Sequence, residues 1–276
     1  MRVALRVAYD GTAFQGSQRQ PHVRTVEGDL LTVLGRIGAV ADAQAAAFEA
    51  AGRTDAGVSA AGNVFAFDTA FRGDELARAA NAYLRDAWVL ARAEVADGWS
   101  PRRAARSRTY VYAAAIDEID ADAGRAQAAF ALFEGEHDFG AFARMEAGRD
   151  PRRRVDVARL SARGPMWQFT VRGDSFLWNQ VRRMVAAALA VARGEAELED
   201  VRRGLAGERV ELGTAPAEGL VLQDVEYDGL RWTTEPKDAR DVLAALRSRV
   251  GAARVAERRA RVLLQGAEGF TRAELP

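Results

Sequence analysis

The sequence has no cysteine, only two histidines, His22 and His137, and a single lysine, Lys237, among its 39 basic residues. The lack of cysteine excludes a disulfide framework and a thiolate metal site. Neither histidine is spaced with carboxylates in a way that resembles a zinc or iron site. No apolar run approaches the roughly 18 residues that a membrane span needs, and the opening stretch MRVALRVAYDG enters a strand pattern directly, so we expect no signal peptide. These absences predict a cytoplasmic protein with no membrane partner and no metal.

An excess of charge of one sign is also missing, because 39 basic residues balance 39 acidic ones. The distribution is uneven, however: SPRRAARSRTY at 100–110 and RDPRRR at 149–154 are rich in arginine and nearly free of acidic residues. Arginine grips phosphate with a two-pronged fork, and a local basic patch can bind phosphate even on a neutral protein. The alternative is that these are ordinary solvated arginines. The candidate phosphate contacts are Arg102, Arg103, Arg106, Arg108, Arg152 and Arg153.

The chain, at 276 residues, is long enough for one large domain or two smaller ones. Apolar alternation and short apolar runs predict strands at 3–9, 45–50, 63–68, 88–95, 107–116, 153–162, 166–173 and 220–227. Capping residues and apolar stripes predict helices at 26–37, 74–84, 122–134 and 178–193. The recurring order of strands and helices predicts an α+β fold with two related subdomains, 1–97 and 98–232. Residues 233–276 read as a helical tail, either a helical pair or a partner-binding segment.

The stretch AGRTDAGVSA at 51–60 sets Arg53 and Asp55 on a bend between two predicted strands. Small residues around the bend let backbone or ligand approach closely. In a structural interpretation, Asp55 caps a short turn and pairs with Arg53. In a functional interpretation, Asp55 is a nucleophile or base that an arginine from elsewhere keeps ionised, beside an aromatic wall for a flat substrate.

Two further stretches supply an aromatic wall and an arginine. RSRTYVYAA places Tyr110 and Tyr112 on the same face of one strand, because side chains alternate along a strand. GDSFLWNQVRRMV runs a tight turn into a helix that starts near Trp178 and carries Arg182 and Arg183 in its first turns. Taken singly, the tyrosines are equally typical of a core, and the arginines of a solvated helix.

The ordered combination of these stretches resembles the tRNA pseudouridine synthase A family, and its archaeal branch in particular, over residues 1–232. The matching stretches are YDGTAFQG, QRQP, RTVEGDL, GRTDAGVSAAGNV, RSRTYVY, FEGEHDF, DSFLWNQVRRMV, RGE and APAEGLVLQDVEYDG. The resemblance implies the pseudouridine synthase fold, with two related α/β subdomains, an antiparallel or mixed central sheet, and an active-site cleft between the subdomains. It also implies that Asp55 is the catalytic aspartate. The substrate-binding residues that it implies are Arg53, Tyr110, Arg182 and Leu220.

The resemblance further implies an isomerase that converts uridine to pseudouridine at positions 38, 39 and 40 of the anticodon stem-loop of tRNA, acting as a homodimer. The reaction needs no electron carrier or ATP, in keeping with a chain that has no P-loop and no dinucleotide fingerprint, so no cofactor is expected. Ser17 departs from the tryptophan common in the family, and Val58-Ser59-Ala60 departs from a common GVHA stretch. Two other readings stay open: a non-catalytic RNA-binding protein of the same fold, and a hydrolase that uses Asp55 with Asp10 or Glu27.

Overall fold

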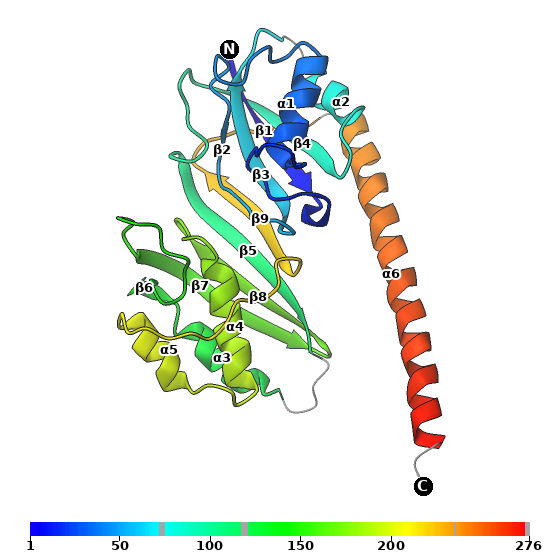
Figure 1. Ribbon diagram of the computed structural model, residues 1–276. Coiled ribbons are helices and arrows are strands. Elements are labelled where there is room, and N and C mark those ends of the chain that lie inside the picture. Colours follow the sequence, from blue (N-terminus) through cyan, green and yellow to red (C-terminus); the bar gives the residue numbers. More distant parts are fainter. Residues whose placement is uncertain (72–74, 117–120, 235, 274–276) are drawn as a thin grey trace. The chain divides into compact units, whose positions relative to one another are not determined.

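The computed structural model describes residues 1–71, 75–116, 121–234 and 236–273. The chain divides into two compact units, residues 1–233 and residues 234–276. Asp74, expected to cap a helix, lies outside the described residues. The first unit contains a mixed sheet with helices packed against it (Figure 1).

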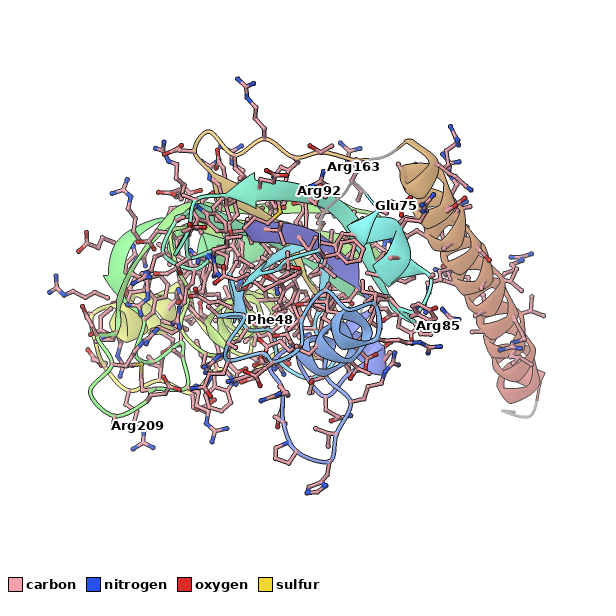
Figure 2. The ribbon with its side chains drawn as sticks, turned by 90° about the horizontal axis from the view of Figure 1, so that it is seen from above. Phe48, Glu75, Arg85, Arg92, Arg163 and Arg209 are labelled. Atoms are coloured by element: carbon pink, nitrogen blue, oxygen red, sulfur yellow. The ribbon has the colours of Figure 1, made fainter. Side chains whose placement is uncertain are left out.

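The N-terminal part of the sheet consists of β1 (Arg2–Tyr9), β2 (Glu49–Ala50), β3 (Ser59–Asp68) and β4 (Ala87–Val95). β1 is antiparallel to both β3 and β4. Phe48, just before β2, packs on Phe65 and Phe67 of β3, with ring centroids 5.9 Å apart in each pair. Figure 2 shows Phe48 among the side chains of the interior, whereas Arg209 points outward. These aromatic contacts pack the segment before β2 against β3, the strand that follows the Asp55 bend.

The C-terminal part consists of β5 (Ala105–Ala115), β6 (Gly135–Asp138), β7 (Arg152–Arg163), β8 (Met166–Gly173) and β9 (Leu220–Tyr227). Neighbouring strands here are antiparallel. Side chains alternate across the sheet, so Tyr110 and Tyr112 of β5 share one face, as expected, and both are buried.

The two parts join through β9, which lies between β3 and β5 (Figure 1). The strand order across the described part of the sheet is β4-β1-β3-β9-β5-β8-β7-β6. β3 and β9 are parallel, with Ser59 opposite Val221 and Ala60 opposite Leu222. Because β3 begins four residues after Asp55 and β9 begins at Leu220, this seam brings the Asp55 bend to the start of β9.

Five helices of the first unit lie against the sheet: α1 (Val26–Arg36), α2 (Leu76–Asn81), α3 (Ala123–Ala131), α4 (Gln180–Ala192) and α5 (Leu198–Leu205), counted within the described residues. Thr25 caps α1 by accepting a hydrogen bond from the Gly28 amide. Our sequence prediction missed α5, although Glu197 and Asp200 form a capping box at its start, a recognised helix signal. The helix predicted at 178 begins at Gln180, since Asn179 has a left-handed backbone conformation with φ 63°.

The second unit is a single helix, α6 (Pro236–Ala273). The tail is therefore one continuous helix and not a helical pair. No helix in the described part of the chain is both long enough and apolar enough to cross a membrane. The division of residues 1–232 at residue 97 stays a prediction, because one sheet runs through both parts.

Candidate active site

Hydrogen bonds to Thr54, the residue before Asp55, hold the backbone at the start of the bend. The Thr54 amide donates to the Ser17 hydroxyl at 2.8 Å, and the Ser17 amide donates to the Thr54 carbonyl at 3.0 Å. The Tyr9 and Thr54 hydroxyls are hydrogen-bonded at 2.8 Å. Ser17 is completely buried, and its hydrogen bonds to Thr54 hold the start of the bend.

The Asp55 carboxylate is held by two side chains, one from the turn just before α4 and one from the first turn of α4. Its Oδ2 accepts from Arg182 at 3.2 Å, and its Oδ1 accepts from the indole N–H of Trp178 at 2.9 Å. The Arg182 side chain is 18% exposed and that of Asp55 is 29% exposed. Partial burial lowers the local dielectric, so this ion pair is stronger than one in open solvent. The Asp55 carboxylate is thus held in place while its side chain stays partly accessible to solvent.

Arg182 is itself oriented by α4 and by the segment before β9. Its Nε donates to the Ala215 carbonyl at 2.7 Å, and one terminal nitrogen donates to the Asn179 side-chain oxygen at 3.2 Å. The Ala215 amide in turn donates to the Arg182 carbonyl at 3.2 Å. These bonds hold the guanidinium in the position from which it donates to the Asp55 carboxylate.

Arg53, the other arginine near the aspartate, forms no ion pair with it. It is exposed, and within the described chain its guanidinium has no hydrogen-bond or ion-pair partner. Its charge acts on Glu27, where it opposes the rise in the pKa of that carboxyl that burial causes. The structural interpretation, in which Arg53 pairs with Asp55, is therefore not what the structure shows.

Tyr110 forms an aromatic wall near the aspartate. It is 9% exposed and meets Phe176 edge to face, with ring centroids 5.4 Å apart. Burial raises the pKa of Tyr110 to about 12; Arg108 opposes the rise and the negative charge of Asp55 adds to it. The hydroxyl therefore stays protonated at neutral pH, and nothing among the described residues accepts its proton.

Leu220 begins β9, where it is buried and stands opposite Tyr112 of β5. The segment just before it touches the Asp55 bend, because a Cβ built on Gly57 would lie 3.2 Å from Ala217. Gly219 lets this segment pass close to β5, since a Cβ there would come within 2.6 Å of the Tyr112 ring. Leu220 thus follows, three residues on, the segment that contacts the Asp55 bend at Gly57.

Trp178 is a site residue that our sequence prediction missed, having treated it only as a helix start. Besides binding Asp55 it is 44% exposed, and the guanidinium of Arg144 lies 4.1 Å from the centroid of its ring. The Arg144 amide also donates to the Trp178 carbonyl at 2.8 Å. The available signal was the position of Trp178 in the DSFLWN stretch, directly before Asn179 at the start of α4.

The candidate phosphate contacts divide into exposed and buried groups. Arg102, Arg103, Arg106 and Arg152 are exposed, and Arg106 pairs with Asp228 at 2.9 Å. Arg153 is half-buried, and burial lowers the pKa of its guanidinium, with Arg149 acting in the same direction.

Arg108 differs from expectation. It is 9% exposed, and its guanidinium donates to the carbonyls of Asp174 at 2.5 Å, Ala51 at 3.0 Å and Arg102 at 2.9 Å. Ala51 leads into the Asp55 bend, and Asp174 leads into the turn that carries Trp178. Arg108 therefore braces the two segments that build the site, in place of the expected phosphate contact.

The carboxylates proposed for a hydrolase are engaged with their own loops. Asp10 accepts hydrogen bonds from the Thr12 amide and hydroxyl, and Glu27 accepts from the Arg19 amide at 2.9 Å. Across the described residues, no group of three His, Asp or Glu side chains is placed to hold a metal ion.

Comparison with known proteins gives the class of this site. A family model described as tRNA pseudouridine synthase matches residues 129–228. Proteins named tRNA pseudouridine synthase A are similar over most of the chain. The one from Thermococcus kodakarensis is 45% identical over 86% of this chain and 89% of its own length, and the one from Methanocorpusculum labreanum is 40% identical over 96% and 93%. The one from Pyrococcus horikoshii is 39% identical over 86% and 89%.

These matches define the class as the pseudouridine synthases, which are isomerases. Within that class, the chain belongs to the tRNA pseudouridine synthase A family. The expected family and α+β fold with a mixed sheet are confirmed.

Proposed function

We propose that this protein isomerises uridine to pseudouridine in tRNA, with the carboxylate of Asp55 as the reacting group. The observation that carries the proposal is the pairing of Asp55 with Arg182 and Trp178 at the seam between β3 and β9, on a bend whose backbone is fixed. Family membership supports the reaction and tRNA as substrate.

The reaction breaks the bond between C1′ of the ribose and N1 of uracil, joins C1′ to C5, and releases the C5 hydrogen to solvent, while N1 takes up a proton. The target base must leave its stack to reach a half-buried carboxylate. The positive charge of Arg182 lies beside the Asp55 carboxylate and opposes the desolvation that a bound base would add. Neutral Tyr110 and apolar Leu220 offer faces for the uracil ring. Attack on the ribose, attack on the ring, and removal of a ribose proton are all open to this carboxylate.

We also propose the finer assignments that the family resemblance implies. The target uridines lie at positions 38, 39 and 40 of the anticodon stem-loop, and exposed Arg53 braces the space that the flipped base leaves. Exposed arginines, together with half-buried Arg153, hold the RNA backbone without reading its sequence. The enzyme works as a homodimer in the cytoplasm. The arginines proposed for the backbone are Arg102, Arg103, Arg106, Arg152 and Arg153.

The test is tritium release from an unmodified tRNA transcript labelled at C5 of uridine. Wild-type protein should release the label, and Asp55→Asn should release none while binding the transcript with nearly unchanged affinity. Asp228→Asn, which alters a 75% exposed carboxylate paired only with Arg106 in the described residues, is the control and should keep full activity. Transcripts with cytidine at position 38, 39 or 40 then assign the target.

Two outcomes would contradict the proposal. Tight tRNA binding by wild type without release of label favours the non-catalytic RNA-binding alternative. Release that persists in Asp55→Asn removes Asp55 from the reaction.

A further inference from the structure

The second unit, α6, has a charge balance unlike the rest of the chain. It contains nine basic residues, Lys237, Arg240, Arg247, Arg249, Arg254, Arg258, Arg259, Arg261 and Arg272, and four acidic ones, Asp238, Asp241, Glu257 and Glu268. The whole chain has 39 residues of each sign. The part outside α6 therefore carries five more acidic than basic residues. For a protein whose proposed substrate is a polyanion, the positive charge is concentrated in the helix.

The arginines of α6 are also ordered along it. Arg240, Arg247, Arg254 and Arg261 recur every seventh residue, and Arg258 lies one turn after Arg254. Seven residues are close to two helical turns, so these side chains fall on one face at a spacing of about 10 Å. All five are exposed. We call Arg240, Arg247, Arg254, Arg258 and Arg261 the arginine stripe.

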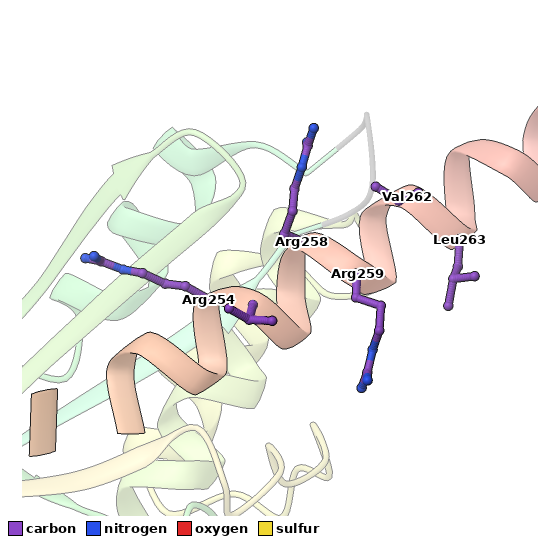
Figure 3. Close-up of a pocket in the computed structure, with 6 residues that line it drawn as sticks. Arg254, Arg258, Arg259, Val262 and Leu263 are labelled. Atoms are coloured by element: carbon purple, nitrogen blue, oxygen red, sulfur yellow. The ribbon is translucent and has the colours of Figure 1, made fainter. Parts of the chain in front are cut away.

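Most arginines of the arginine stripe have no acidic partner among the described residues. Arg261 pairs with Glu257 at 2.9 Å, one turn earlier. Arg247, Arg254 and Arg258 have no hydrogen-bond or ion-pair partner among the described residues. Figure 3 shows Arg254, Arg258 and Arg259 extended away from the helix axis. A shallow open groove there is lined by these three arginines with Val255, Val262 and Leu263.

We propose that α6 is an RNA-binding arm, whose arginine stripe contacts the phosphate backbone of the tRNA substrate and supplies much of the salt-dependent affinity. The inference rests on the proposed function for its partner. Charge complementarity favours RNA as the partner of α6. A row of unpaired guanidinium groups can bind a chain of phosphates, because arginine can bind each phosphate through two parallel hydrogen bonds. Such contacts position an RNA without specifying its sequence.

The test compares full-length variants by fluorescence anisotropy with a labelled, unmodified tRNA transcript over a range of salt concentrations. Each phosphate contact releases counterions and contributes about 0.7 to 0.9 to the slope of log affinity against log salt. The triple variant Arg247→Gln, Arg254→Gln, Arg258→Gln should lose about two from that slope and bind at least tenfold more weakly. The control triple Arg163→Gln, Arg209→Gln, Arg231→Gln makes the same change in net charge at exposed positions of the first unit and should change the slope by less than one.

Two further measurements separate charge from folding. Glutamine has a good helix propensity, so the circular dichroism of the triple variant should match wild type. Replacing the same three arginines by lysine should restore most of the slope, because lysine retains the positive charge. At saturating tRNA, the rate of tritium release should be unchanged, since the loss lies in binding.

An unchanged slope in the α6 triple overturns the inference, as does an equal loss in the control triple. Concentration-dependent self-association that the triple abolishes, with tRNA binding intact, assigns α6 to a second copy of the chain instead. Binding does not require turnover, so a lost slope without tritium release from wild type supports the arm while contradicting the proposed reaction.

Discussion

Replacing Arg108 by methionine tests whether one buried side chain holds the site together. Methionine fills much of the volume of the arginine stem but cannot donate to the carbonyls of Asp174, Ala51 and Arg102. The bond to Ala51 is fully buried, and the other two are partly buried. A buried acceptor left unsatisfied costs about 1–3 kcal/mol.

The expected loss in the free energy of unfolding is about 1–3 kcal/mol. The full cost of an unsatisfied acceptor applies only to the carbonyl of Ala51, because water can reach the carbonyls of Asp174 and Arg102 in the variant. Removing a guanidinium whose pKa burial lowers also relieves some desolvation cost. The control is Arg106→Met, two residues away on the same strand, which breaks an exposed ion pair with Asp228 and should leave the urea midpoint nearly unchanged.

Urea denaturation followed by tryptophan fluorescence is the assay. All five tryptophans lie within residues 1–233, so the signal reports the first unit and not α6. Where both variants are folded, Arg108→Met should also lower the rate of tritium release, because Ala51 and Asp174 lead to the two halves of the site. Equal stability of the two variants would refute the energetic reasoning. A stability loss with an unchanged rate would refute the positioning role.

Gly219→Ala should lower the free energy of unfolding by about 1–3 kcal/mol, because the new Cβ overpacks against Tyr112. Gly52→Ala is the control and should be neutral, since no atom lies within 4 Å of its new Cβ. Paired urea titrations measure both variants, and equal effects would contradict the prediction. Asn179→Ala should lose about 1 kcal/mol more than Asn179→Gly, since only glycine adopts φ 63° without strain, and equal midpoints would argue against stored strain. Burial raises the pKa of Tyr110 to about 12 in the folded protein, so the unfolded chain loses this proton at lower pH. The stability of the fold should therefore fall as the pH rises from 10 to 12. Tyr110→Phe should reduce that fall by about 1.4 kcal/mol per pH unit, as measured by urea midpoints.

The local structure of the site was predictable because it depends on neighbouring residues. Alternation placed Tyr110 and Tyr112 on one face of β5, and a threonine before an apolar stripe marked the start of α1 at Val26. The bend that carries Asp55 was likewise visible in its glycines and flanking strands. Each of these features is set within a few residues of chain, where side-chain direction and capping follow simple rules.

The partners of Asp55 were decided only by the tertiary structure. Arg53 is two residues away in sequence, yet the carboxylate pairs with Arg182, 127 residues later, and with Trp178, 123 residues later. The order of the strands brings these segments together, since β9 enters the sheet between β3 and β5 and no local pattern encodes that insertion. Arg108 shows the same limit. The arginine-rich stretch predicted a phosphate contact, but β5 lies between β9 and β8 and buries this side chain, so its charge is met by carbonyls inside the protein. The sequence by itself determined which chemical groups the protein has and which way they point along each element, whereas long-range packing decided which of them meet.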